Sequence, residues 1–156
     1  MAETARIAIM DVMNRVLLPL LLAFGLPAHA WEFTPVPVCT LKHETDAVSV
    51  RVTHDPQAAE PYAIEITRPL PWPSSDGFAI RFDGPLGMTI TTDRHSLSNG
   101  GTTLTVTDQG FGNVLDGIEF NRAATAIAGD AAVAIPLDGA AGPMQEFRAC
   151  LVPAAV

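Results

Sequence analysis

The chain has 156 residues, of which 48% are hydrophobic and 17% are charged. This length accommodates one ordinary domain, and the apolar fraction excludes a disordered chain. Seventeen acidic residues against nine basic ones give a net charge of -8, which excludes nucleic acid as the principal partner because such binding depends on lysine and arginine.

The first feature in chain order is an apolar run, Val16 to Leu26, that follows Arg15. The run is too short to cross a bilayer core of roughly 30 Å, which needs about 20 residues. Small residues at Ala28 and Ala30 stand at the two positions that a signal peptidase reads. The pattern therefore predicts a secretory signal that is cleaved after Ala30.

This interpretation divides the chain into a signal peptide, residues 1–30, and a single β-rich domain, residues 31–156. Met13 begins a more compact signal than Met1 does, so we expect translation to start at Met13. The alternative is a buried N-terminal helix, which has to accommodate Pro19 and Gly25 in its interior.

Cys39 and Cys150 are the only cysteines. In an exported chain, two cysteines at opposite ends predict one disulfide bond. The bond would close a loop of about 110 residues and supply on the order of 4 kcal/mol. Their spacing does not fit a redox pair or a zinc site.

Short β-branched runs with a period of two follow, separated by Pro, Gly, Asp and Asn, which is typical of antiparallel strands. The Asp-Gly-Pro-Leu-Gly segment at 83–87 predicts a hairpin loop, and residues 98–101 give the strongest turn signal. Trp72 is expected to close one end of the core. The predicted strands span residues 36–43, 48–54, 62–67, 78–82, 88–92, 104–107 and 131–137.

Residues 110–129 fit either a helix or a strand, and we favour a short helix near 113–117. The steps of three and four between Met144, Phe147 and Leu151 predict a C-terminal helix over 139–150. The fold class is therefore mainly β: one antiparallel β-sandwich or flattened barrel of about seven strands, with a short C-terminal helix.

A candidate site lies in residues 91–96, where Asp93, Arg94 and His95 fall in a predicted loop. A small hydrolase that uses His95 and Asp93 is one alternative, but the chain has no nucleophile-elbow motif. We favour a structural or surface role for His95, with Asp93 capping the turn. The glycine-rich segment 110–117 adds further residues, so the possible ligand or partner site comprises Asp93, Arg94, His95, Phe111, Asn113 and Asp116.

Metal binding is the second alternative, because His43, His54 and His95 stand near predicted strand ends. Their spacing matches no ligand pattern, and we favour solvent-facing positions for His43 and His54. Segment 110–117 lacks the lysine of a phosphate-binding loop. We therefore expect no catalytic residue, metal site or cofactor.

Five segments span nearly the whole mature chain: Trp31, 38–44, 91–95, 110–117 and 147–150. In these segments the chain resembles a group of short exported bacterial proteins of unsettled function. Some members of that group carry the label of the helicase component of excinuclease ABC, but an acidic, exported chain of this length does not fit a DNA-repair helicase. A looser similarity, to invasion-associated locus B proteins, rests on an early cysteine, a β-rich body and a terminal helix.

The expected function is that of a periplasmic or secreted, non-enzymatic β-sandwich protein. Its partner would be an unknown protein or an envelope component, with no nucleic acid and no membrane span after signal removal. The hydrolase and the metal-binding accessory protein are the alternatives.

Overall fold

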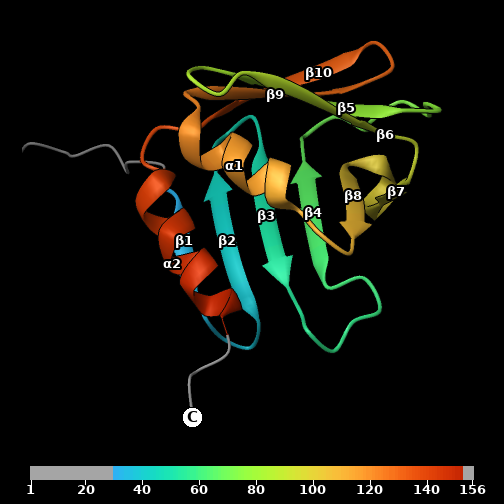
Figure 1. The fold of residues 1–156 in the computed structure, drawn as a ribbon. Helices are drawn as coiled ribbons and strands as arrows, with labels where there is room; N and C mark the ends of the chain where they lie inside the picture. The colour runs from blue at the N-terminus through green and yellow to red at the C-terminus, as the bar shows by residue number, and fades with distance from the viewer. Residues whose placement is uncertain (1–29, 153–156) are drawn as a thin grey trace, which may run out of the picture.

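The computed structural model describes residues 30–152 (Figure 1). The predicted leader lies outside these residues, except for Ala30. In chain order the elements are β1 (Glu32–Thr34), β2 (Cys39–Glu44), β3 (Ser49–His54), β4 (Tyr62–Thr67), β5 (Phe78–Asp83), β6 (Met88–Thr92), β7 (His95–Ser98), a 3-10 helix (Asn99–Gly101), β8 (Thr103–Asp108), α1 (Gly112–Phe120), β9 (Ala123–Ala128), β10 (Ala131–Pro136) and α2 (Ala141–Leu151).

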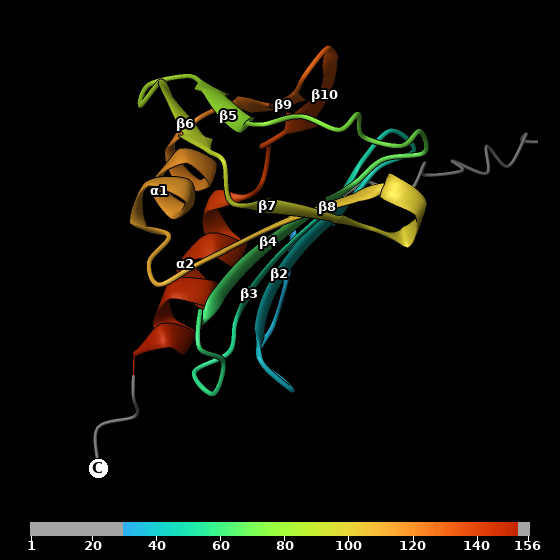
Figure 2. The same cartoon turned by 90° about the vertical axis from the view of Figure 1, so that its right-hand side faces the viewer.

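The strands form two antiparallel sheets. A six-stranded sheet has the order β1-β2-β3-β4-β8-β7, and a four-stranded sheet has the order β10-β9-β5-β6. Neither sheet closes on itself, so the predicted sandwich is confirmed and the flattened barrel is not. Figure 2 shows the smaller sheet over one end of the larger one.

Alternation of side chains explains which face of the larger sheet is buried. In β3, Val50 and Val52 are buried while Arg51 is exposed. In the strand register Arg51 lies opposite Lys42 of β2 and opposite Glu65 of β4, so charged side chains share the outer face. Since the period of a strand is two, this register sends the valines into the core.

Both helices lie on the inner side of the larger sheet (Figures 1 and 2). α1 packs beneath the smaller sheet, and Gly117 permits the contact because a Cβ there would lie 2.5 Å from the ring of Phe82. α2 packs against α1, β1 and β2 and buries Met144 and Phe147 completely. Among the described residues, no helix is long and apolar enough to span a membrane.

The predicted disulfide is confirmed. Cys39 and Cys150 are bonded, with Cα atoms 6.1 Å apart. Cys39 begins β2 and Cys150 lies in the last turn of α2. The bond therefore fixes the last helix to the first long strand.

The described residues contain ten strands, whereas about seven were predicted. The expected first strand, 36–43, is replaced by β1 and β2, with prolines 35 and 37 between them. The predicted loop at 91–96 runs into β7, which begins at His95. Residues 110–129, which fit either a helix or a strand, contain both α1 and β9. Trp72 is buried at 3% exposure, in agreement with its predicted place in the core.

Candidate functional site

A polar pocket of about 300 Å³ opens at the edge of β2, beyond the last residue pair between β1 and β2, Glu32 and Lys42. Its inner wall is His43, which is buried and stacks on Trp31 with ring centroids 4.8 Å apart. This burial corrects the prediction that His43 faces solvent. The pair could not be recognised from sequence patterns, because Trp31 and His43 meet only across the β1–β2 pairing.

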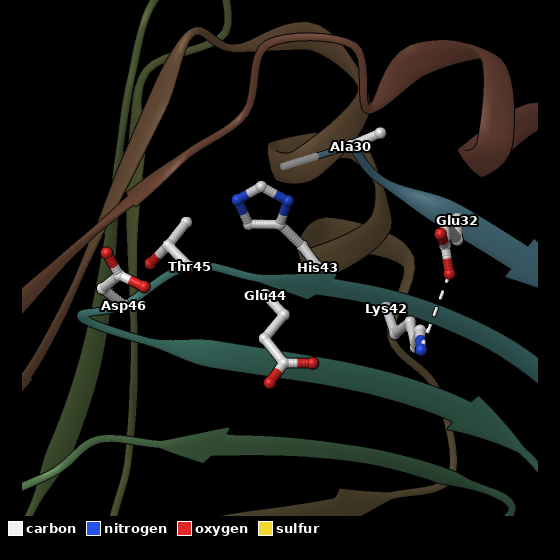
Figure 3. A pocket seen from close by; sticks show the side chains of 7 residues that line it. All are labelled: Ala30, Glu32, Lys42, His43, Glu44, Thr45 and Asp46. Carbon is white, nitrogen blue, oxygen red and sulfur yellow. Dashed lines mark ion pairs between the residues drawn. The ribbon is translucent and has the colours of Figure 1, made fainter. Parts of the chain in front are cut away.

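Charged side chains surround this pocket (Figure 3). Lys42 pairs with Glu32 at 3.5 Å. Glu44 points away from His43, since neighbouring residues of a strand face opposite sides. Asp46 stands beyond the end of β2, so the carboxylates lie around the rim without converging.

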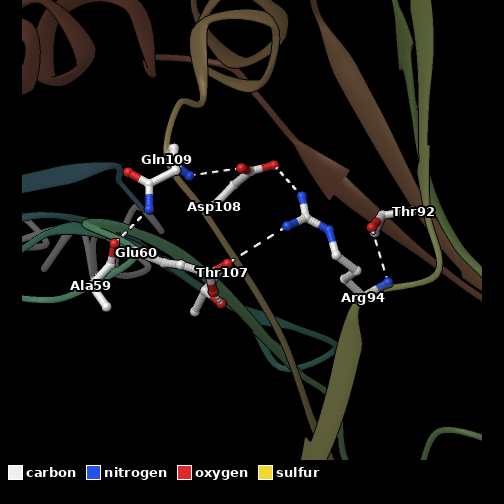
Figure 4. A network of polar contacts seen from close by, with 7 residues as sticks. All are labelled: Ala59, Glu60, Thr92, Arg94, Thr107, Asp108 and Gln109. Atoms are coloured by element: carbon white, nitrogen blue, oxygen red, sulfur yellow. Dashed lines mark hydrogen bonds and ion pairs between the residues drawn. The ribbon is translucent and has the colours of Figure 1, made fainter.

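The predicted site contains a cluster of polar contacts centred on Arg94 (Figure 4). Its guanidinium group contacts Asp108 at 2.6 Å and Glu60 at 3.6 Å. Glu60 also accepts a hydrogen bond from the hydroxyl of Thr107. The backbone N–H of Arg94 donates to the hydroxyl of Thr92 at 3.0 Å. Thr92, rather than the predicted Asp93, therefore caps this turn.

Gln109 extends the cluster to the loop before β4. Its backbone N–H donates to Asp108 at 2.7 Å, and its side-chain amide donates to the carbonyl of Ala59 at 2.5 Å. The cluster therefore ties together the segments that precede β4, precede β7 and follow β8.

His95 begins β7, directly opposite Val106 of β8. Because Val106 is buried, this pairing directs the imidazole toward the inner face, where it lies 6.2 Å from the ring of Phe78. His95 Nδ1 is buried and has no hydrogen-bond partner among residues 30–152. Asp93 is exposed and does not orient this histidine.

Phe111 is buried and stacks on Tyr62 with ring centroids 5.5 Å apart. It lines an apolar cavity of about 60 Å³ between the sheets and α1, together with Ile90 and Val114. The Phe111 side chain therefore serves packing at the start of α1.

The remaining two predicted residues lie on α1. Asn113 is exposed. Asp116 binds Arg148 of α2 at 2.6 Å, and Arg148 also contacts Glu119 at 2.7 Å. The six predicted residues therefore form no single site: Arg94 lies in the polar cluster, His95 and Phe111 face the core, Asp116 lies in the α1–α2 contact, and Asp93 and Asn113 are exposed.

The histidines considered for metal binding do not converge. His54 lies against Tyr62, whereas His43 lies against Trp31 and His95 near Phe78. Within the part of the chain that the structure describes, no group of three or more His, Cys, Asp or Glu side chains is arranged to hold a metal ion.

Comparison with known proteins yields no relative. No protein-family model, curated protein sequence or solved structure matches this chain.

Proposed function

We propose that this chain is a periplasmic or secreted β-sandwich protein that binds a partner protein or an envelope component without catalysing a reaction. The observation that carries the export is the Cys39–Cys150 disulfide, since disulfides persist in oxidising compartments. The disulfide joins the first long strand to the last helix, across a sequence separation of 111 residues.

The contacts of Trp31 are compatible with the proposed cleavage after Ala30. Ala30 is exposed, whereas Trp31 is buried at 4% exposure and donates a hydrogen bond to the carbonyl of Pro136 at 3.0 Å. Removal of residues 1–30 would therefore leave every described core residue in place.

The contacts that Arg94 and His95 make favour a binding protein over a hydrolase. A histidine that activates a nucleophile is normally oriented by a carboxylate. His95 instead packs near Phe78, and Arg94 forms ion pairs with Glu60 and Asp108. Binding requires only an exposed surface of suitable shape and charge.

The proposal is tested with the oxidised protein, purified from the periplasm of an expressing bacterium and used as bait in periplasmic extract. We expect one partner to be retained in repeated experiments and to bind again after separate purification. His95→Ala and Asp93→Ala test the hydrolase, because that alternative requires both side chains.

Two results would contradict the proposal. One is retention of the chain in the cytoplasm with residues 1–30 attached. The other is hydrolysis of a chromogenic ester that is lost in His95→Ala and in Asp93→Ala, which would favour the hydrolase.

A further inference from the structure

β10 is an edge strand of the four-stranded sheet, and it carries no charged side chain (Figure 1). Its pairing with β9 begins at Ala131 opposite Ala128, across the two-residue turn Gly129–Asp130. A turn of this length is closed by a hydrogen-bonded pair, and such pairs then alternate along the ladder. Backbone groups of Ala131 and Val133 therefore point toward β9.

The alternate residues of β10, Ala132, Ala134 and Pro136, point their backbone groups away from β9. Two hydrogen bonds support this assignment: Leu137 N–H donates toward β9, to Arg122, whereas the Pro136 carbonyl accepts from Trp31 on the other side. Among the described residues, no hydrogen bond occupies the outward N–H and C=O groups of Ala132 and Ala134.

This edge differs from the usual protected one. Sheet edges are normally protected by charged side chains, proline or a covering element. Among residues 30–152, protection of this kind is found at the end of β10, where Pro136 has no N–H and Trp31 donates to its carbonyl. The exposed side chains of Ala132 and Ala134 are small enough for another strand to approach closely.

An open groove of about 550 Å³ lies at the Ala131–Ala132 end of this strand. Pro71, Trp72 and Pro73 line one side, and Asp130, Ala131 and Ala132 line the other. The side chain of Pro73 lies 3.2 Å from the position that a Cβ of Gly129 would occupy, so the two sides meet near the β9–β10 turn.

Charge indicates what the groove would accept. Arg68 lies over the ring of Trp72, 4.7 Å from its centroid, and donates to the carbonyls of Leu70 and Pro71. The guanidinium group is thereby fixed in the wall and keeps its charge, and Asp130 is exposed on the other side. Neither Arg68 nor Asp130 forms an ion pair with a described residue. The net charge of -8 attracts a basic partner and repels a second copy.

We propose that the outward edge of β10 binds an extended, apolar segment of a partner protein that carries one basic residue for Asp130. The segment adds a strand to the four-stranded sheet through Ala132 and Ala134 and lies in the groove beside Pro71–Pro73. Backbone hydrogen bonds supply the affinity in this mode of recognition, and the groove supplies the specificity. The inference rests on the proposed partner-binding function and names its surface.

The probes are synthetic peptides of alternating valine and threonine, about eight residues long, which is an ordinary strand length. One begins with lysine, one begins with glutamate, and one is the lysine peptide with alternate backbone nitrogens methylated. The lysine peptide should slow amide hydrogen exchange at Ala132 and Ala134 by at least about tenfold. Exchange at Ala131 and Val133, already bonded to β9, should not change.

Matched variants separate the backbone contribution from the charge. Ala132→Pro removes one outward N–H and should lower the affinity for the lysine peptide by about tenfold. Ala132→Val retains the N–H and should leave this affinity unchanged. Asp130→Asn should weaken binding of the lysine peptide but not of the glutamate peptide. Asp138→Asn is the control and should change the binding of neither peptide. Thermal unfolding followed by circular dichroism verifies that each variant folds. The exchange experiment uses the unmutated protein, so it tests the proposal even if a variant fails to fold.

The proposal is overturned if the lysine peptide leaves both amides unchanged, or if the methylated peptide binds equally well. A dimer in sedimentation that Ala132→Pro dissociates would identify a second copy as the occupant and would also overturn it. If the partner captured from periplasmic extract still binds Ala132→Pro, the surface is wrong while the proposed function stands.

Discussion

The indole ring of Trp31 lies nearly parallel to the imidazole ring of His43, with 10° between the ring planes. The indole N–H donates to the carbonyl of Pro136 at the end of β10. Trp31 therefore joins β2 of the larger sheet to the last strand of the smaller one.

The first prediction concerns this junction. Trp31→Ala removes a buried aromatic side chain and should lower the free energy of unfolding by about 3–5 kcal/mol. Val36→Ala is the control, because Val36 is 70% exposed and its truncation should change stability by less than about 0.5 kcal/mol. Urea unfolding of the oxidised protein measures both, and equal stabilities would contradict the proposed packing.

Two glycines of α1 supply the second prediction. Gly117→Ala places a Cβ 2.5 Å from the ring of Phe82 and should cost about 1–3 kcal/mol, although alanine favours a helix. Gly112 has no heavy atom within 4 Å of its Cβ position, so Gly112→Ala should be neutral or stabilising. Thermal unfolding distinguishes them, and Phe82→Leu should recover part of the Gly117→Ala loss. A Gly117→Ala protein as stable as Gly112→Ala would be inconsistent with this helix placement.

The third prediction concerns Arg148, which contacts Asp116 and the largely buried carboxylate of Glu119. Arg148→Ala leaves that carboxylate without its cation and should cost about 1–3 kcal/mol. Arg81→Ala breaks an exposed pair with Asp83 and should cost less than about 1 kcal/mol. Chemical denaturation in the same buffer compares them, and a larger loss for Arg81→Ala would argue against the α1–α2 contact.

The fourth prediction concerns the disulfide. Cys150→Ser should lower the free energy of unfolding by about 2–5 kcal/mol. Cys39→Ser should lower it by a similar amount, and the double variant should be no less stable than either single one, because all three remove the same bond. Additive losses in denaturant unfolding would mean that the two cysteines act separately.

Local patterns in the sequence predicted the strands with clear alternation, β3 and β4 among them. The same patterns do not predict β7, because its residues after His95 are exposed and lack that alternation. In β9, alanine alternates mostly with alanine and threonine, so hydrophobic periodicity did not separate a strand from a helix.

The candidate site was less predictable, because its residues are brought together by contacts between distant segments. Arg94 and Asp108 meet through the β7–β8 pairing, whereas Asp116 turns to Arg148 of α2. Neighbours in a sequence give no such information. The disulfide was predictable because a chain with two cysteines has one possible pairing.

Intact-mass spectrometry of the protein from the periplasmic fraction, before and after treatment with an alkylating agent, tests export and oxidation together. The expected mass is that of residues 31–156 with two hydrogens removed by the Cys39–Cys150 bond, and alkylation should not change it. A full-length mass, or the addition of two alkyl groups without prior reduction, would contradict the exported, disulfide-bonded domain.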